Sequence, residues 1–252
     1  MVRSIVPRRI LGVIPARFSS SRFPGKALAM IAGKPMFQHV YERACQAQYL
    51  SEVIIATDDE RIFTAARDFG SKARMTRADH LSGSDRAAEI ASSDSAAYIV
   101  NIQGDEPLID PAAIDAAVLG LVNEADTPMS TLAKRIQNPR DIEDANIVKV
   151  VTDLRGYALY FSRCPIPFVR GDRPPCFKHI GLYAYRREFL LGYSRMPVGP
   201  LERAEKLEQL RALENGHSIR VVETEYESVG VDTPEDLERL LHWMGSAQAE
   251  QS

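Results

Sequence analysis

Three cations gather in one short segment of the chain. The segment is "ARFSSSRFPGK", residues 16–26, and it carries Arg17, Arg22 and Lys26 together with three serines and a glycine. Fixed positive charge and backbone N–H donors on a loop that follows a strand are suited to binding a phosphate group. The segment contains neither GxxxxGK[ST] nor GxGxxG, so neither common phosphate-binding fingerprint applies. Taken alone, it fits an exposed surface loop, with Lys26 exposed to solvent, as well as it fits a phosphate site.

Two carboxylates are candidate metal ligands beside that loop. Asp105 lies in "NIQGDEP" and Asp232 lies in "GVDTPEDL". A carboxylate repels a nearby phosphate unless a cation lies between them, and Mg²⁺ commonly bridges one or two carboxylates and substrate phosphates. Each acid also has a structural alternative. Gly-Asp and Glu-Pro are turn dipeptides, and Asp232 before "TPEDL" is typical of a helix N-cap.

Alternating strands and helices in the first half of the chain would position these residues. Apolar, β-branched runs predict buried strands, and the patterns between them predict helices that begin near Pro35 and end near Gly70. Such alternation indicates an α/β fold with a doubly wound, mostly parallel sheet that binds its ligand at the carboxyl ends of the strands. The predicted strands are residues 10–15, 52–58 and 97–105, and the predicted helices are residues 35–47, 59–70 and 83–93.

The second half of the chain has a different pattern. Apolar and polar residues alternate with period two in "STLAKRI", "NIVKVVTD", "YALYFSR" and "KHIGLYAYR", which indicates a smaller antiparallel layer. We expect this layer to form a lid or a dimer contact on the same domain. The segment "LERAEKLEQLRALENG", residues 201–216, predicts one helix with a leucine stripe toward the core.

Composition limits the class of protein. A chain of 252 residues with 45% hydrophobic content predicts one domain, residues 10–245, between a flexible leader (1–9) and a tail (246–252). The 31 basic and 34 acidic residues give a net charge of -3, which argues against a nucleic-acid partner. Three cysteines without zinc-type spacing indicate reduced thiols in a cytoplasmic protein. No apolar run approaches the roughly 20 residues of a membrane helix.

Nine short motifs, in order along nearly the whole chain, resemble the 3-deoxy-manno-octulosonate cytidylyltransferase (CMP-Kdo synthetase) family. They are "IPARFSSSRFPGK", "GKPM", "ATDDERI", "SGSDRAAE", "VNIQGDEP", "GYALYFSR", "KHIGLYAYR", "LEQLRALENG" and "GVDTPEDL". Each motif is weak alone, but nine in order are specific. The resemblance implies a nucleotide-diphospho-sugar transferase fold, a homodimer and Mg²⁺. It also implies the reaction of CTP with 3-deoxy-D-manno-octulosonate (Kdo) to give CMP-Kdo and pyrophosphate for lipopolysaccharide biosynthesis.

The resemblance also implies roles for individual residues. The catalytic candidates are Arg17, Lys26, Asp105 and Asp232, of which the two acids would bind the metal. The nucleotide-binding candidates are Arg17, Ser19, Ser20, Arg22, Lys26, Arg77, Ser82, Gly83, Asp85 and Gln103. The sugar-binding candidates are Gln103, Arg163, His179, Tyr183, Glu208 and Gln209. An N-cap role for Ser82 and a structural role for His179 are the alternatives.

Other functions remain open at this stage. One subgroup of the family activates an 8-amino derivative of Kdo, and related enzymes activate other nonulosonate-like sugar acids. A glycosyltransferase of similar fold would normally carry a DxD-type metal motif, and "QGDEP" is not one. A non-catalytic nucleotide-binding domain would be expected to lack Lys26, Asp105 or Asp232, and all three are present.

Overall fold

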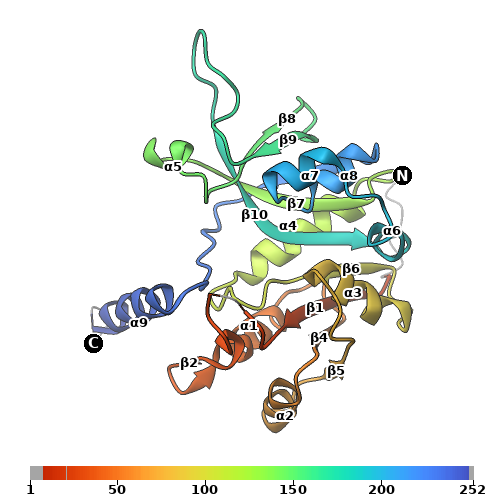
Figure 1. Cartoon of the computed structure of the whole chain (residues 1–252), viewed down its shortest axis with the longest axis vertical. Helices are drawn as coiled ribbons and strands as arrows, with labels where there is room; N and C mark the ends of the chain where they lie inside the picture. Colours follow the sequence, from red (N-terminus) through yellow and green to blue (C-terminus); the bar gives the residue numbers. More distant parts are fainter. Residues whose placement is uncertain (1–7, 21, 250–252) are drawn as a thin grey trace.

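A mixed β-sheet crosses the middle of the molecule, with helices on both faces (Figure 1). The structure is a computed structural model and describes residues 8–20 and 22–249. Within these residues the main sheet has nine strands, and its central path runs in the order β11-β7-β10-β6-β1-β4-β5. The strands are β1 (Ile10–Ala16), β4 (Glu52–Thr57), β5 (Ala73–Met75), β6 (Tyr98–Asn101), β7 (Met129–Arg135), β8 (Lys149–Thr152), β9 (Ala158–Ser162), β10 (Phe177–Arg186) and β11 (Ile219–Glu223), and β2 (Met30–Ile31) pairs with β3 (Lys34–Pro35) in a separate hairpin.

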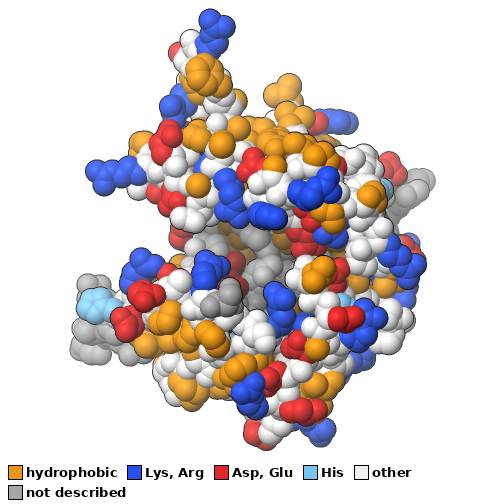
Figure 2. All heavy atoms as spheres, in the orientation of Figure 1, with side chains coloured by type: hydrophobic (Ala, Val, Ile, Leu, Met, Phe, Trp, Pro, Cys, Tyr) orange, Lys and Arg blue, Asp and Glu red, His pale blue; other side chains and the backbone are white. Residues whose placement is uncertain are grey.

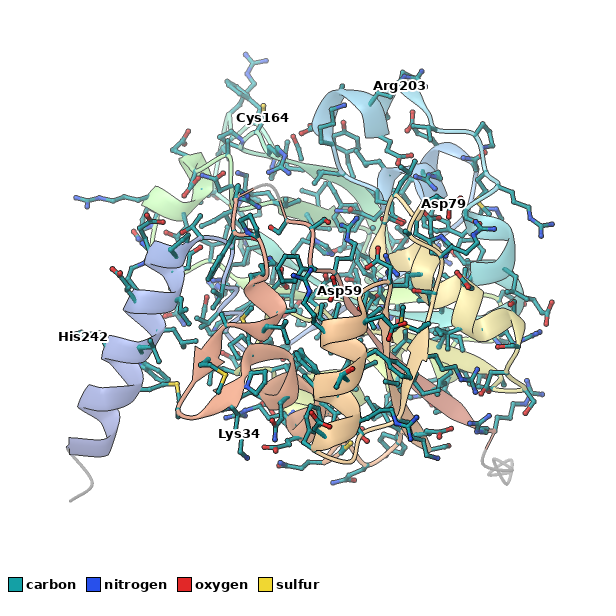
Figure 3. All side chains as sticks on the ribbon, turned by 60° about the horizontal axis from the view of Figure 1, so that its bottom comes forward. Lys34, Asp59, Asp79, Cys164, Arg203 and His242 are labelled. Atoms are coloured by element: carbon teal, nitrogen blue, oxygen red, sulfur yellow. The ribbon has the colours of Figure 1, made fainter. Side chains whose placement is uncertain are left out.

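Helices connect most of these strands. They are the short 3-10 helix η1 (Lys26–Leu28), α1 (Met36–Ala44), α2 (Glu60–Asp68), α3 (Gly83–Ser92), α4 (Pro111–Val122), α5 (Arg140–Glu143), α6 (Arg187–Tyr193), α7 (Pro200–Glu205), α8 (Leu210–Glu214) and α9 (Pro234–Ala249). The predicted start of the second helix is confirmed, because Asp59 caps α2 by accepting a hydrogen bond from the backbone N–H of Arg61 at 2.9 Å (Figure 3).

The residues of β1 explain why this strand is central. Ile10 and Ile14 pack on one face of the sheet, in a cluster that includes residues of α1, α2 and α4. Leu11 and Val13 pack on the other face, with residues of α3, α6 and α8. A strand covered on both faces is apolar throughout, which confirms the doubly wound arrangement that the sequence predicts.

Strand pairing brings the carboxyl ends of three strands to one edge. β1 pairs in parallel with β4 and with β6, and Ala16 lies beside Thr57 while Val13 lies beside Asn101. The loops that follow these strands therefore leave the same edge of the sheet. The cationic segment follows β1, and the segment with Asp105 follows β6.

The antiparallel part of the prediction is also confirmed. β10 pairs antiparallel with β6, β7 and β8, and β8 pairs antiparallel with β9. The pairing of β10 with β7 shifts register between Ile180 and Tyr183. The segment between β9 and β10 projects from the molecule beyond β8 and α5 (Figure 1).

Two predicted elements are wrong in their bounds. The third strand was predicted over residues 97–105, but β6 ends at Asn101, so Asp105 lies in the following turn. The single helix over residues 201–216 is two short helices, α7 and α8, because Lys206 adopts a left-handed backbone conformation with φ 55°. Leu201 is consequently 42% exposed and is not part of a core stripe.

The predicted leader and tail lie partly outside the described residues, namely residues 1–7 and 250–252. Arg9 forms ion pairs with Glu52 and Asp94, and α9 extends to Ala249 beyond the α1 and β2 side of the molecule (Figure 1). The boundary at residue 245 stays a prediction. Across residues 8–20 and 22–249, no helix has the length and apolar character needed to cross a membrane. The three cysteines are free thiols.

Candidate active site

A cavity of about 540 Å³ lies at the carboxyl edge of the parallel strands. Figure 2 shows the molecule hollowed between the part with β8 and β9 and the part with α1 and β2, with Lys and Arg side chains near the rim. Most of the predicted phosphate and metal residues line the cavity. Its lining comprises Pro15, Ala16, Arg17, Ser19, Ser20, Arg22, Lys26, Ala27, Gly83, Gln103, Gly104, Asp105 and Asp232.

The cationic segment is folded back on itself at the mouth of this cavity. The backbone N–H of Gly25 donates to the carbonyl of Phe18 at 2.8 Å, and Gly25 has φ 74°, a left-handed conformation that glycine adopts at little cost. The ring of Phe18 lies under the guanidinium of Arg61, 3.3 Å from the ring centroid to Cζ. These contacts close the loop and place Lys26 at the start of η1.

Lys26 lies between the two predicted metal ligands. Its Nζ is 2.5 Å from Asp105 Oδ2 and 2.9 Å from Asp232 Oδ1, and it donates to the carbonyl of Val231 at 3.3 Å. Burial by itself would lower the pKa of Lys26, but the two carboxylates outweigh burial and raise it. The lysine is therefore held charged, and with 16% of its side chain exposed it is not the exposed loop residue that the sequence suggested.

Asp232 is not the cap of α9. Its second carboxylate oxygen is 3.0 Å from Arg22 Nη2, so both of its oxygens face cations. The cap is Thr233, whose Oγ1 accepts from the backbone N–H of Asp236 at 3.3 Å, while Asp236 Oδ2 accepts from the backbone N–H of Thr233 at 2.9 Å. This reciprocal pair is a capping box, and it leaves the Asp232 carboxylate available to the cavity.

Gly104 is a cavity residue that the sequence analysis missed. A Cβ atom at this position would lie 2.7 Å from the backbone oxygen of Pro15, closer than real Cβ contacts. The turn after β6 thus passes directly against the end of β1, and the backbone N–H of Val231 donates to the carbonyl of Asp105 at 2.9 Å. These contacts bring Asp105 and Asp232 together. The Gly-Asp pair in "QGDEP" was the available signal for a tight turn.

Four of the predicted nucleotide-binding residues, Arg77, Ser82, Gly83 and Asp85, surround the start of α3 at the edge of the cavity. Ser82 and Asp85 form a capping box at the start of α3, which confirms the N-cap alternative for Ser82. Gly83 lines the cavity, but Arg77, Ser82 and Asp85 are not among its lining residues. The Arg77 side chain is exposed and its Nε is 3.1 Å from Asp79 Oδ1.

The predicted sugar-binding residues are a second group, of which only Gln103 lines the cavity; the others lie on β10, directly after β9 and between α7 and α8. Gln103 belongs to both, since it lines the cavity and its Nε2 donates to the carbonyl of Gly181 at 2.9 Å. His179 and Tyr183 lie on β10 with ring centroids 5.4 Å apart. Arg163 donates from Nε to the carbonyl of Glu205 at 2.9 Å and from Nη1 to that of Ala145 at 3.0 Å. Gln103 thus connects the phosphate side of the site to β10.

His179 is a neutral side chain in this group. Burial lowers its pKa to about 3, and its ring packs edge-on against Phe161. The Thr131 hydroxyl faces two carbonyl oxygens, those of Ile180 and Leu182, and uses its single proton there. His179 Nε2, 2.9 Å from Thr131 Oγ1, therefore donates, which leaves Nδ1 as an acceptor.

The turn between α7 and α8 contributes the last two residues of the group. Ser82 Oγ donates to Glu208 Oε1 at 3.4 Å, and burial raises the pKa of Glu208. Gln209 is 4% exposed, and its Nε2 has no hydrogen-bond partner among the described residues. A buried amide donor without a partner is uncommon and points toward a ligand or water as its acceptor.

The donor set fits a magnesium ion shared with a phosphate substrate. Within residues 8–20 and 22–249, no group of three or more His, Cys, Asp or Glu side chains is arranged to bind a metal. Asp105 and Asp232 are two hard oxygen donors that already share one cation, the ammonium of Lys26. Mg²⁺ typically takes one or two carboxylates and completes its shell with phosphate oxygens and water, so two acids suffice.

A cavity with three cations at the carboxyl edge of a doubly wound sheet is where open α/β proteins bind their ligands. The family model described as "Cytidylyltransferase" matches residues 11–219. Solved structures of a 4-diphosphocytidyl-2C-methyl-D-erythritol synthase from Anaerococcus prevotii (TM-score 0.62, 11% identity, 95% of this chain and 99% of that one) and of a cytidylyltransferase from Leptospira borgpetersenii (TM-score 0.63, 19% identity, 93% of this chain and 85% of that one) share the fold. The class of protein is thus a nucleotidyltransferase.

Closer relatives narrow this class. A 3-deoxy-manno-octulosonate cytidylyltransferase from Solibacter usitatus is 72% identical over 93% of this chain and 94% of its own, and one from Geobacter sulfurreducens is 58% identical over 92% and 98%. A solved CMP:2-keto-3-deoxy-manno-octonic acid synthetase complexed with CTP superposes with a TM-score of 0.91 at 45% identity, covering 95% of this chain and 99% of that one. The chain belongs to the 3-deoxy-manno-octulosonate cytidylyltransferase family.

Proposed function

We propose that the protein transfers CMP from CTP to Kdo and releases pyrophosphate, supplying CMP-Kdo for lipopolysaccharide biosynthesis. The observation that carries the proposal is the arrangement of Lys26, Asp105 and Asp232 in a cationic cavity of about 540 Å³. In the reaction, a hydroxyl oxygen of Kdo forms a bond to the α-phosphorus of CTP. The bond from that phosphorus to the bridging oxygen breaks, pyrophosphate leaves and the hydroxyl proton is released.

The cations of the loop bind the triphosphate in this proposal. Arg17, Arg22 and Lys26 line one cavity with Ser19 and Ser20. Charge accumulates on the departing pyrophosphate as the bond breaks, and fixed cations stabilise that charge most in the transition state. Arg22 and Lys26 currently contact carboxylates, so binding of CTP exchanges these partners for phosphate oxygens.

Asp105 and Asp232 hold Mg²⁺ in this proposal. The ion would withdraw charge from the α-phosphorus and lower the pKa of the attacking hydroxyl, so that no dedicated protein base is needed. The two acids would hold the ion, and Lys26 keeps the pair of carboxylates compensated before CTP arrives.

The second group of residues binds the sugar acid in this proposal. Arg163 is the cation for the Kdo carboxylate, since guanidinium and carboxylate match in shape. His179 Nδ1 accepts from a sugar hydroxyl, and the unpartnered Gln209 Nε2 donates to a sugar oxygen. His179 binds rather than catalyses, because a pKa of about 3 makes it a poor general base near neutral pH.

Pyrophosphate release tests the function directly. We expect release with CTP only when Kdo and Mg²⁺ are both present. UTP should react more weakly, and ATP and GTP should not react, since a site closed by the backbone at Gly83 fits a pyrimidine ring better than a purine. Chelation of Mg²⁺ should abolish release. Comparable release with ATP, or release without Kdo, contradicts the proposal. 8-amino-Kdo and a nonulosonate such as sialic acid serve as competing acceptors, and a faster reaction with one of them changes the assigned substrate.

The assembly and compartment are part of the same proposal. A homodimer would use the antiparallel layer, where Leu159 on β9 is 62% exposed, together with the segment between β9 and β10, where Phe168 is 88% exposed. A monomer in light-scattering measurements at micromolar concentration contradicts it. The three free cysteines agree with a reducing cytoplasm.

A further inference from the structure

Arg86 is a fully buried arginine that the reaction as described does not use. It lies on α3, its side chain has no exposed surface, and it is one of the largest side chains buried to this degree. Its Nη2 is 3.1 Å from Asp58 Oδ2, and its Nη1 donates to Thr76 Oγ1 and, at 3.4 Å, to the carbonyl of Arg77. Its Nε has no hydrogen-bond partner among the described residues.

A buried ion pair is not the most stabilising way to fill this part of the core. Burial of a guanidinium is costly, and a well-packed apolar side chain in place of a buried ion pair is often neutral or stabilising. Here the compensation is incomplete as well, because one N–H of Arg86 is unpaired within the described part of the chain and Asp58 is partly exposed. The ion pair therefore contributes more to geometry than to stability.

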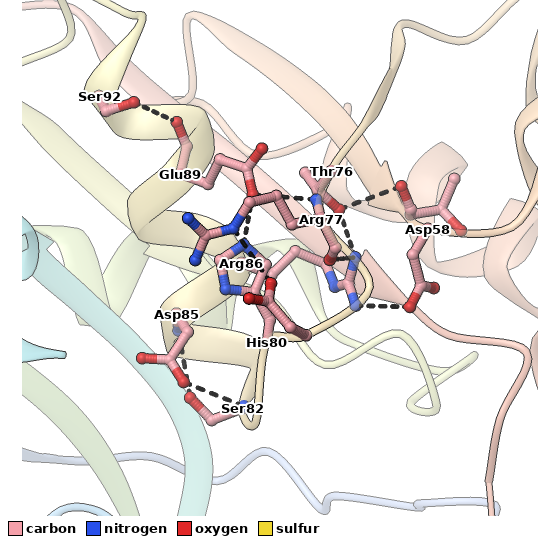
Figure 4. A network of polar contacts seen from close by, with 11 residues as sticks. Asp58, Thr76, Arg77, His80, Ser82, Asp85, Arg86, Glu89 and Ser92 are labelled. Carbon is pink, nitrogen blue, oxygen red and sulfur yellow. Dashed lines mark hydrogen bonds and ion pairs between the residues drawn. The ribbon is translucent and has the colours of Figure 1, made fainter.

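The contacts of Arg86 fix the segment 76–82, which we name the β5–α3 loop (Figure 4). Arg86 joins the beginning of this loop to Asp58, directly after β4. Glu89, one turn further along α3, accepts from the backbone N–H of Arg77 at 3.1 Å and contacts His80. The capping box of Asp85 holds the end of the loop. Asp85, Arg86 and Glu89, in the first half of α3, thus contact the loop at its end, its beginning and its middle.

The β5–α3 loop is adjacent to the nucleotide cavity. It leads into Gly83, which lines the cavity, and its Leu81 carbonyl accepts from Arg17 Nη1 at 3.4 Å. The loop is only seven residues long, so Thr76 and Arg77 are few residues away from Leu81 and Gly83.

We propose that Arg86 is a positioning residue that sets the β5–α3 loop for recognition of the cytosine base. The inference rests on the proposed function, since CTP is taken as the substrate. Arg86 acts through the loop and does not touch the nucleotide. Its loss should therefore weaken CTP binding about equally in the ground state and the transition state, which raises KM and leaves kcat nearly unchanged.

The test compares Arg86→Met with Arg74→Met. Arg74 lies on β5 and contacts Ser93 at the other end of α3, so its variant is a matched control. For Arg86→Met we expect KM for CTP to rise about tenfold or more, kcat to stay within about threefold, and the preference for CTP over UTP to fall about fivefold. Thr76→Val removes one hydrogen-bond acceptor of Arg86 without changing the side-chain volume, and it should change KM for CTP and the preference for CTP over UTP in the same direction. This second variant tests the proposal even if Arg86→Met does not fold.

Amide hydrogen exchange in the nucleotide-free protein separates this inference from the proposed function. Residues 77–82 should exchange about tenfold faster in Arg86→Met and Thr76→Val than in the wild type or Arg74→Met. Exchange in this segment at the wild-type rate in both variants overturns the inference, and so does an unchanged KM and CTP preference. A wild-type protein that releases no pyrophosphate from CTP contradicts the proposed function, and the exchange experiment still decides whether Arg86 positions the loop.

Discussion

Replacement of Asp232 by asparagine separates a metal ligand from a helix cap. The Asp232 side chain is 47% exposed and contacts Lys26 and Arg22 at 2.9 and 3.0 Å. Ion pairs this exposed contribute about 0–1 kcal/mol to stability because solvent screens them. In a chain of 252 residues, about 1 kcal/mol changes the melting temperature by about 2–4 °C. Asp232→Asn should therefore unfold within about 4 °C of the wild type.

The effect on turnover should be much larger. Asparagine keeps the shape of the side chain but provides no charge to hold Mg²⁺ against the α-phosphate. Loss of a main electrostatic stabiliser typically lowers turnover by about a hundredfold or more, or about 2.7 kcal/mol of activation free energy. CTP should still bind through the cations of the loop, because Arg17 and Lys26 are unchanged.

Two measurements on two variants distinguish a metal-ligand role of Asp232 from a helix-cap role. Pyrophosphate release at saturating CTP and Kdo is measured beside thermal unfolding for Asp232→Asn and for Thr233→Ala. Thr233→Ala removes the capping acceptor of α9, so it should lower stability by about 1 kcal/mol and retain turnover. Near-normal turnover of Asp232→Asn refutes the two-carboxylate metal site. A melting temperature of Thr233→Ala equal to that of the wild type refutes the assignment of the cap to Thr233.

Three further predictions follow from the contacts in the site. Lys26→Met should weaken CTP binding about tenfold and destabilise the protein by about 1–2 kcal/mol, since two carboxylates lose their shared cation. If calorimetric titration gives this variant the same affinity for CTP as the wild type, the prediction is wrong. As the pH is lowered from about 7.5 to about 5, the free energy of unfolding of the wild type should fall by about 2 kcal/mol. His179→Gln should not show this fall. In the unfolded wild type, His179 takes up a proton near pH 6.5, whereas in the folded protein its pKa is about 3 and it stays neutral. Protonation therefore favours the unfolded chain, and the stability present above pH 6.5 falls as the pH is lowered. Parallel denaturation curves for the two proteins over this pH range would show that the histidine is solvated. Gly104→Ala should cost about 1–3 kcal/mol because its Cβ would meet the Pro15 carbonyl at 2.7 Å, whereas Gly171→Ala, with open space around it, should be neutral in the same denaturant titration.

Local sequence patterns were sufficient for the parallel half of the fold. β1 and β4 are continuous apolar runs because both faces of each strand are covered, and the runs end where the chain leaves the core. Asp59 and Ser82 are capping residues immediately before helical patterns, and both helices begin there. Since parallel strands share one carboxyl edge, the order of strands and helices along the chain was enough to place the loop cations and Asp105 on the same side of the sheet.

Local patterns were misleading where a distant contact decided the conformation. The apolar run before Asp105 reads as a longer strand, but the close approach of Gly104 to Pro15 turns the chain after Asn101. The leucine spacing of residues 201–216 predicts one helix, but Lys206 takes a left-handed conformation and divides it. In the first case, Pro15 lies outside the residues whose pattern was read, and in the second, the spacing of the leucines carries no information on the backbone conformation of Lys206.

The sequence by itself determined which groups are available for chemistry, and the family motifs indicated their expected partners in the reaction. Only the tertiary structure decided that Lys26 lies within 2.9 Å of both Asp105 and Asp232, although Asp232 is 206 positions away along the chain. It also decided that Thr233, and not Asp232, caps α9, and that Arg86 is buried beneath the β5–α3 loop. The physical reason is range. Strand, helix and cap preferences act over a few residues, whereas the position of a charge depends on which distant groups the packed core brings beside it.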